Sequence, residues 1–162
     1  MNYLIIENDT IENNSKIQQI NEHIRNKKPA VIYFYKEGCP FCERTTPEWD
    51  KLHNYLSQNK DLLVVRINKL LYEKLHYIGD NPTLYPNIRY VRGSHIDIFK
   101  KEGDERNAKN LAMWIQQQSL QQKTHIRPPF YIKRSHKPPK FKKSFRKRKH
   151  LMRNKFTKRR MY

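Results

Sequence analysis

The feature that most constrains this chain is the position of its two cysteines, Cys39 and Cys42, between an apolar run and an amphipathic segment. Residues 30–35 read Ala-Val-Ile-Tyr-Phe-Tyr, and this β-branched and aromatic run predicts a buried strand. Gly38 marks a turn, and Pro40 suits the first turn of a helix, where its missing N–H costs little. The pattern therefore predicts a strand, a turn, Cys-x-x-Cys and a helix, in that order.

This order favours thiol chemistry. The unpaired N–H groups and the dipole at the start of a helix stabilise negative charge. A thiol at that point loses its proton more readily, and the thiolate is the nucleophile. Cys39 comes first, on the turn, so we expect it to be the exposed, attacking sulfur. Cys42 follows one helical turn later and can attack a mixed disulfide on Cys39.

Two other uses of a Cys-x-x-Cys pair fit the chain less well. A zinc site needs two further ligands, and the sequence has no third cysteine and no pair of histidines at metal-binding spacing. A structural disulfide between Cys39 and Cys42 would close too small a loop to restrict the unfolded chain. We therefore expect neither a metal nor a bound cofactor.

The rest of residues 1–122 alternates between strand and helix patterns. We expect strands over 3–6, 30–35, 62–67, 88–91 and around 96–98, and helices over 15–26, after Cys42, over 70–77 and after Asn107. Asn14 or Ser15 can cap the first helix, and Asn107 the last. This order predicts an α/β fold with a central mixed β-sheet flanked by helices.

The stretch around the cysteines resembles the active site of the thioredoxin superfamily, especially domains of the protein disulfide isomerase type. Pro47 lies five residues after Cys42, where that family has a helix-kinking proline, and Glu48-Trp49 continue the likeness. The inner dipeptide Pro40-Phe41 is closer to glutaredoxins. The resemblance implies a thioredoxin fold over most of residues 1–122. It also implies a protein-disulfide oxidoreductase with Cys39 as nucleophile and Cys42 as resolving residue.

A second segment, residues 84–91, resembles the family's loop in which a cis-proline precedes a strand and faces the cysteines. Pro86 matches that proline, whereas Pro82 follows Gly-Asp-Asn and reads better as a plain turn. The simpler alternative is that Pro86 only begins an edge strand. The resemblance implies that substrates dock on Tyr85, Pro86, Pro40 and Phe41.

Two positions depart from the family pattern. Thioredoxins carry a buried carboxylate six residues before the first cysteine, which is thought to move protons for the second cysteine, and this chain has Tyr33 there. The Tyr33 hydroxyl, a water molecule or Glu37 can take that role, and the sequence leaves the choice open. Gly38 replaces the tryptophan that usually precedes the first cysteine, which removes part of the docking surface.

The formal net charge of +19 is concentrated near the C-terminus. Residues 123–162 hold 17 of the 34 Lys and Arg residues and no Asp or Glu, whereas residues 1–122 hold 17 basic and 15 acidic residues. The sequence therefore predicts a domain over 1–122 and a polybasic tail over 123–162 that is disordered or conditionally helical. Basic side chains of this tail can neutralise the phosphates of nucleic acid or the charges of another polyanion. The clearest candidates are Lys142, Lys143, Arg146, Lys147, Arg148, Lys149, Lys158, Arg159 and Arg160.

The tail supports a second hypothesis of a different class, a non-catalytic thioredoxin-fold protein that binds nucleic acid or forms part of a virion. Weak, non-specific attraction of a solvated tail to any polyanion is the simpler alternative. A redox domain delivered by its tail to a nucleoprotein would combine both functions. Oligomeric state and the direction of electron flow stay open.

The N-terminal residues contain no basic segment, so we expect no secretory signal. The sequence also has no apolar run of membrane-spanning length. We expect the protein in the cytoplasm, the nucleus or a virion, with thiols or disulfides of other proteins as its substrates.

The tail should form a basic helix when it binds a polyanion. Phe141, Phe145, Met152 and Phe156 fall within about 60° of one helical face, at about 100° per residue. The segment has no acidic partners for its cations, so charge repulsion keeps it unfolded alone. Circular dichroism of a peptide of residues 138–162 should show helix gained with nucleic acid and, more weakly, with anionic vesicles. No gain with either ligand would reject coupled folding.

Overall fold

The structure is a computed structural model that describes residues 2–125, so the predicted polyanion-binding residues of the tail lie outside the described residues. The strands are β1 (Asn2–Ile6), β2 (Ala30–Tyr35), β3 (Leu63–Asn68), β4 (Asn87–Arg92) and β5 (His95–Ile98). The α-helices are α1 (Ile11–Arg25), α2 (Pro40–Asp50), α3 (Leu52–Leu56) and α4 (Ala108–His125). Two 3₁₀ helices, η1 (Lys69–Lys74) and η2 (Gly103–Glu105), complete the described elements.

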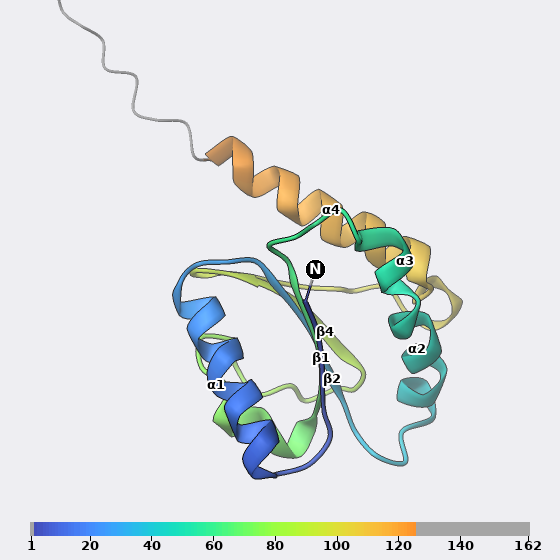
Figure 1. Ribbon diagram of the computed structural model, residues 1–162. Helices are drawn as coiled ribbons and strands as arrows, with labels where there is room; N and C mark the ends of the chain where they lie inside the picture. Colours follow the sequence, from blue (N-terminus) through green and yellow to red (C-terminus); the bar gives the residue numbers. More distant parts are fainter. Residues whose placement is uncertain (1, 126–162) are drawn as a thin grey trace, which may run out of the picture. The chain divides into compact units, whose positions relative to one another are not determined.

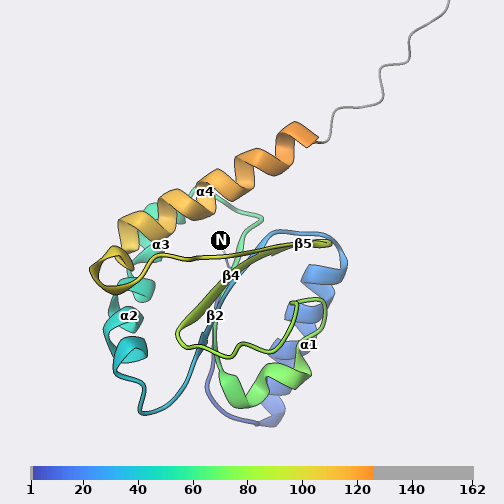
Figure 2. The ribbon, with the colours of Figure 1, turned by 180° about the vertical axis from the view of Figure 1, so that it is seen from behind.

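The strands form one mixed sheet in the order β1-β3-β2-β4-β5. Strand β3 pairs in parallel with β1 and β2, while β4 pairs antiparallel with β2 and β5. Helix α1 and η1 cover one face of this sheet, and α2, α3 and α4 cover the other (Figures 1 and 2). The predicted α/β fold with a central mixed sheet is confirmed.

Strand β2 lies in the middle of the sheet and is buried on both faces. Ala30, Ile32 and Phe34 belong to the core cluster under α1, whereas Val31 and Tyr33 belong to the cluster under α2, α3 and α4. Successive side chains of a strand point to opposite faces, so this division follows from the sequence. It places the Tyr33 side chain on the α2 side of the sheet, where its hydroxyl reaches the backbone of Cys42.

Several predicted bounds shift in the structure. Helix α1 begins at Ile11 instead of residue 15, and its cap is Thr10, whose hydroxyl accepts a hydrogen bond from the Asn13 N–H at 3.2 Å. Ile11 is 93% exposed and lies outside the apolar stripe, so the pattern of buried residues could not show this first turn. The segment predicted as a helix over 70–77 is the shorter 3₁₀ helix η1.

The helix that follows the cysteines is divided into α2 and α3. Helix α4 continues to His125, past the predicted domain boundary after residue 122. No helix of the described residues is both long and apolar enough to cross a membrane.

The Thr10 cap can be tested against the cap that the sequence predicted. Thr10→Ala should lower the free energy of unfolding by about 1 kcal/mol, because it removes the acceptor for an N–H of the first helical turn. Ser15→Ala should leave the stability unchanged or raise it slightly, because Ser15 lies exposed inside α1 and alanine favours helix. Urea unfolding of both variants measures the difference. A larger loss in Ser15→Ala would contradict the observed helix start.

Candidate active site

Helix α2 starts directly at the cysteine pair. Cys39 is the N-cap, in an extended conformation, and its Sγ accepts a hydrogen bond from the Cys42 N–H at 3.2 Å. Pro40 occupies the first helical turn, where a missing N–H removes no intrahelical bond. A thiolate at Cys39 would therefore lie at the positive end of the helix dipole, as the sequence predicted.

The two sulfurs are close but differ in access to solvent. Both cysteines are free thiols, and the Cys42 Sγ lies 2.6 Å from the Cys39 Sγ. Cys39 is partly exposed, whereas Cys42 is only 2% exposed. A reagent from solvent therefore meets Cys39 first, and the buried Cys42 sulfur can reach the Cys39 sulfur from the protein interior.

The loop before β4 faces the cysteines. The Cys39 Sγ lies 3.8 Å from the Tyr85 carbonyl oxygen, which accepts from the thiol. The Tyr85–Pro86 peptide bond is the cis bond of the described residues. The structure thus brings together Cys39 and Tyr85, which are 46 residues apart in the chain.

Tyr33 lies under Cys42, at the position where the sequence departs from the carboxylate of the thioredoxin pattern. Its hydroxyl donates to the Cys42 carbonyl oxygen at 3.0 Å and lies 3.1 Å from Thr46 Oγ1. The Thr46 hydroxyl also donates to the Cys42 carbonyl oxygen, at 2.9 Å. Glu37, another candidate for this role, instead accepts from Asn68 at 3.1 Å. Of these two side chains, Tyr33 is the one hydrogen-bonded to the Cys42 backbone.

This network is uncharged at neutral pH. Burial, together with the hydrogen bond to Cys39, raises the pKa of the Cys42 thiol to about 12. Burial also raises the pKa of the Tyr33 hydroxyl. Both groups therefore keep their protons over the physiological range, and the thiolate fraction of Cys42 grows only as the pH rises towards 12.

Arg89 is a site residue that the sequence reasoning missed. It is 4% exposed, its Nη1 donates to the Ile78 carbonyl oxygen at 2.6 Å, and its Nε donates to Asn87 Oδ1 at 2.7 Å. The guanidinium also lies 5.5 Å from the centre of the Phe34 ring. Arg89 thereby joins both ends of the loop that carries Tyr85 and Pro86. The sequence signal that could have revealed it is an arginine flanked by apolar and aromatic residues in β4, because arginine is rarely buried unless its guanidinium is paired.

No group of three or more metal-binding side chains occurs among the described residues. The predicted docking residues Pro40 and Phe41 lie in the first turn of α2, and Phe41 is 52% exposed.

A mixed sheet of this order, with a Cys-x-x-Cys pair at the start of α2 and a cis-proline beside it, defines a thioredoxin-fold domain. The chain belongs to the thioredoxin family, because the family model described as Thioredoxin matches residues 11–117. Membership of this family and the Cys39–Cys42 pair support, in general terms, a thiol–disulfide oxidoreductase.

Solved structures with the same fold include domains of the protein disulfide isomerase family. A zinc-bound form of human ERp44 matches with a TM-score of 0.52 and 20% identity, over 70% of this chain and 31% of that chain. The J-Trx1 fragment of ERdj5 matches with a TM-score of 0.50 and 18% identity, over 70% of this chain and 49% of the fragment. The chain thus spans less than half of each of these proteins, and the likeness concerns the fold. No curated protein matches the chain.

Alkylation should distinguish the two cysteines. With limiting iodoacetamide at neutral pH, mass spectrometry should find Cys39 modified first, because Cys42 is buried and protonated. In a Cys39→Ser variant, the rate at Cys42 should still rise between about pH 9.5 and about pH 10.5, whereas an ordinary thiol with a pKa of about 8.5 is almost fully ionised by about pH 9.5. Initial modification of Cys42 would reverse the two assignments.

Proposed function

We propose that this chain exchanges electrons between its Cys39–Cys42 pair and disulfides or dithiols of other proteins. The observation that carries the proposal is the pairing of a partly exposed sulfur at the start of α2 with a buried sulfur 2.6 Å away. This is the arrangement that thiol–disulfide exchange requires, since one sulfur must meet the substrate and the second must reach the first.

The exchange has two steps. The Cys39 thiolate attacks one sulfur of a substrate disulfide, so that the Cys39–substrate S–S bond forms and the substrate S–S bond breaks, releasing one substrate thiolate. Cys42 then loses its proton to solvent and attacks the Cys39 sulfur, which releases the second substrate thiolate. The Cys39–Cys42 pair gives up two electrons, and the substrate takes them up. The reverse sequence oxidises a substrate dithiol, and the reduction potentials of both pairs set the direction.

The second step takes place without a carboxylate on Cys42. Tyr33 and Thr46 hold the Cys42 carbonyl oxygen with neutral hydroxyls, so they position the resolving cysteine but do not serve as a base at neutral pH. Because the pKa of Cys42 is raised to about 12, its thiolate fraction at neutral pH is small. Burial still raises this pKa once Cys39 is in the mixed disulfide, so the second step should become faster as the pH rises.

Substrate docking is assigned to the surface around Cys39. The Tyr85 carbonyl oxygen lies close to the attacking sulfur, and the exposed Phe41 ring offers apolar contact beside it. Tyr85, Pro86, Pro40 and Phe41 then contact the chain that carries the substrate disulfide.

The basic tail adds a means of localisation to this proposal. The charge of residues 123–162 suits a nucleic acid or another polyanion, to which the tail would tether the redox domain. A non-catalytic nucleic-acid-binding or virion protein is the alternative that the same charge supports.

Substrate trapping tests the exchange. In Cys42→Ser the second step is blocked, so mixed disulfides on Cys39 should accumulate, and non-reducing electrophoresis with mass spectrometry should identify the trapped proteins. Cys39→Ser is the matched control and should trap far fewer, because Cys42 is 2% exposed. Equal trapping by both variants, or none by Cys42→Ser, would reject the assigned roles.

A further inference from the structure

A cavity of about 240 Å³ lies between α2 and the loop that leads into α4. Phe41, Arg44 and Glu48 line it from α2, and Arg106 lines it from that loop. Because Phe41 lies in the same first turn of α2 as Cys42, the cavity borders the turn that carries the cysteine pair.

Among the side chains that the structure describes, the two arginines of this cavity have no ion-pair partner. The Arg44 guanidinium lies 4.9 Å from the centre of the Phe41 ring, a cation–π contact that orients it but leaves its charge unneutralised. Both guanidiniums therefore keep N–H donors available for a ligand.

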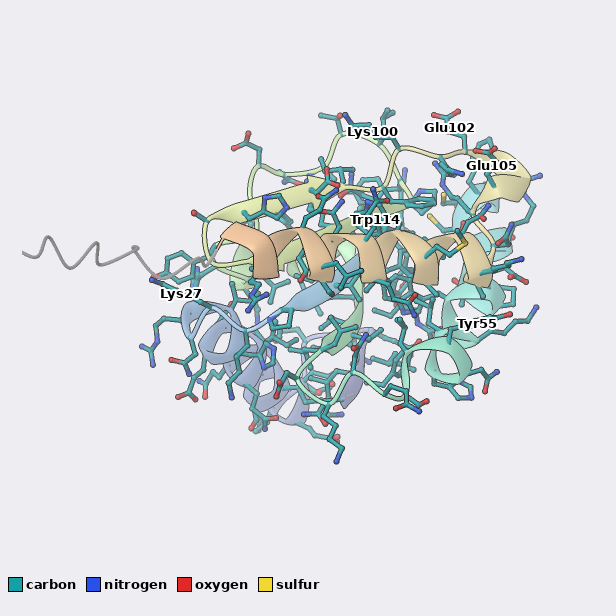
Figure 3. The ribbon with its side chains drawn as sticks, turned by 90° about the horizontal axis from the view of Figure 1, so that it is seen from above. Lys27, Tyr55, Lys100, Glu102, Glu105 and Trp114 are labelled. Atoms are coloured by element: carbon teal, nitrogen blue, oxygen red, sulfur yellow. The ribbon has the colours of Figure 1, made fainter. Side chains whose placement is uncertain are left out.

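The carboxylate of the cavity is already engaged. Glu48 Oε1 pairs with Lys51 Nζ at 2.5 Å, and Glu48 Oε2 accepts the Ala108 N–H at 2.9 Å. These contacts lower the pKa of Glu48, so its charge is fixed in place and committed to neighbours other than the arginines. Glu105, the last residue of η2 (Figure 3), forms its ion pair with Lys101, with 3.9 Å between Glu105 Oε2 and Lys101 Nζ.

The start of α4 borders the same cavity next to Arg106. Its positive end is already occupied by the Glu48 carboxylate, which accepts the Ala108 N–H at 2.9 Å. The two guanidiniums therefore supply the remaining positive charge of the cavity.

We propose that this cavity binds a carboxylate of the substrate, carried by an Asp or Glu side chain close to the half-cystine that Cys39 attacks. The inference rests on the proposed exchange activity and names the substrate class, disulfides with an acidic neighbour. A guanidinium presents a planar set of donors that matches a carboxylate, and two of them in one cavity favour such a ligand over a neutral amide. Arg44 and Arg106 are then specificity residues that contact the substrate.

The test compares disulfide-linked peptide pairs that differ only by Glu or Gln at one position next to the half-cystine. In the full-length Cys42→Ser chain, the rate of mixed-disulfide formation on Cys39 should be about three- to fivefold higher for a Glu peptide, the range of a partly exposed ion pair. When Arg44→Gln and Arg106→Gln are added to this chain, the ratio of the Glu-peptide rate to the Gln-peptide rate should fall sharply.

A matched control separates the cavity from the general charge of the chain. The double variant Arg25→Gln/Lys28→Gln also removes two positive charges, but these lie before the first residue of β2. The cysteines follow the last residue of β2, about 20 Å away by strand geometry. Figure 3 shows the neighbouring Lys27 and the loop residue Glu105 at opposite ends of the domain. This control should keep the preference for Glu peptides. Equal losses in both double variants, or equal rates for Glu and Gln peptides in the Cys42→Ser chain, would overturn the proposal.

A binding measurement keeps the outcome independent of the chemistry. In a Cys39→Ser/Cys42→Ser chain, the Nε–Hε resonances of Arg44 and Arg106 should shift on titration with a linear Glu peptide and stay in place with its Gln counterpart. If no peptide forms a mixed disulfide but these shifts occur, the exchange activity fails and the carboxylate site stands. Identical spectra with both peptides would reject the site, whatever the rates show.

Discussion

The whole site depends on the burial of β2 on both faces. Because helices cover both sides of this strand, Tyr33 must place a large polar side chain inside the core. A buried phenol needs a hydrogen-bond partner, and the partner it finds is the Cys42 carbonyl oxygen at 3.0 Å. The same contact joins the first turn of α2 to the sheet, and the helix turn itself sets the distance between the two sulfurs.

This constraint has a chemical consequence. A carboxylate under Cys42 could hold a proton or a charge at neutral pH, whereas Tyr33 and Thr46 supply only neutral hydroxyls. Cys42 therefore lies in uncharged, buried surroundings that raise the pKa of its thiol to about 12. Cys39 is the more accessible of the two sulfurs, so the surface around it is the part of the site that a substrate would meet first.

That surface is built from segments that are far apart in the chain. Arg89 joins the two ends of the loop with Tyr85 and Pro86, and the loop before α4 brings Arg106 into the same cavity as Arg44. Cys39 thus faces a backbone carbonyl oxygen of one loop, and the turn of α2 that follows it borders a cavity with two arginines. Its substrates would be read by backbone contacts on the first side and by charge on the second.

The positions of the strands and the start of α2 could be predicted from the sequence. The side of the sheet that each strand residue faces follows from alternation along the strand, and the helix start follows from the turn and the proline before it, which are local signals. The same local signals predicted that Cys39 and Cys42 are the reacting pair, and the structure shows that their sulfurs lie 2.6 Å apart. The Thr10 cap, the 3₁₀ form of η1 and the buried role of Arg89 could not be predicted, because each depends on what packs against it. The choice of Tyr33 over Glu37 beneath Cys42 was likewise decided only when β2 and α2 came together. Local residue patterns determine which elements form, whereas the partners of buried polar groups are set by neighbours that only the tertiary fold supplies.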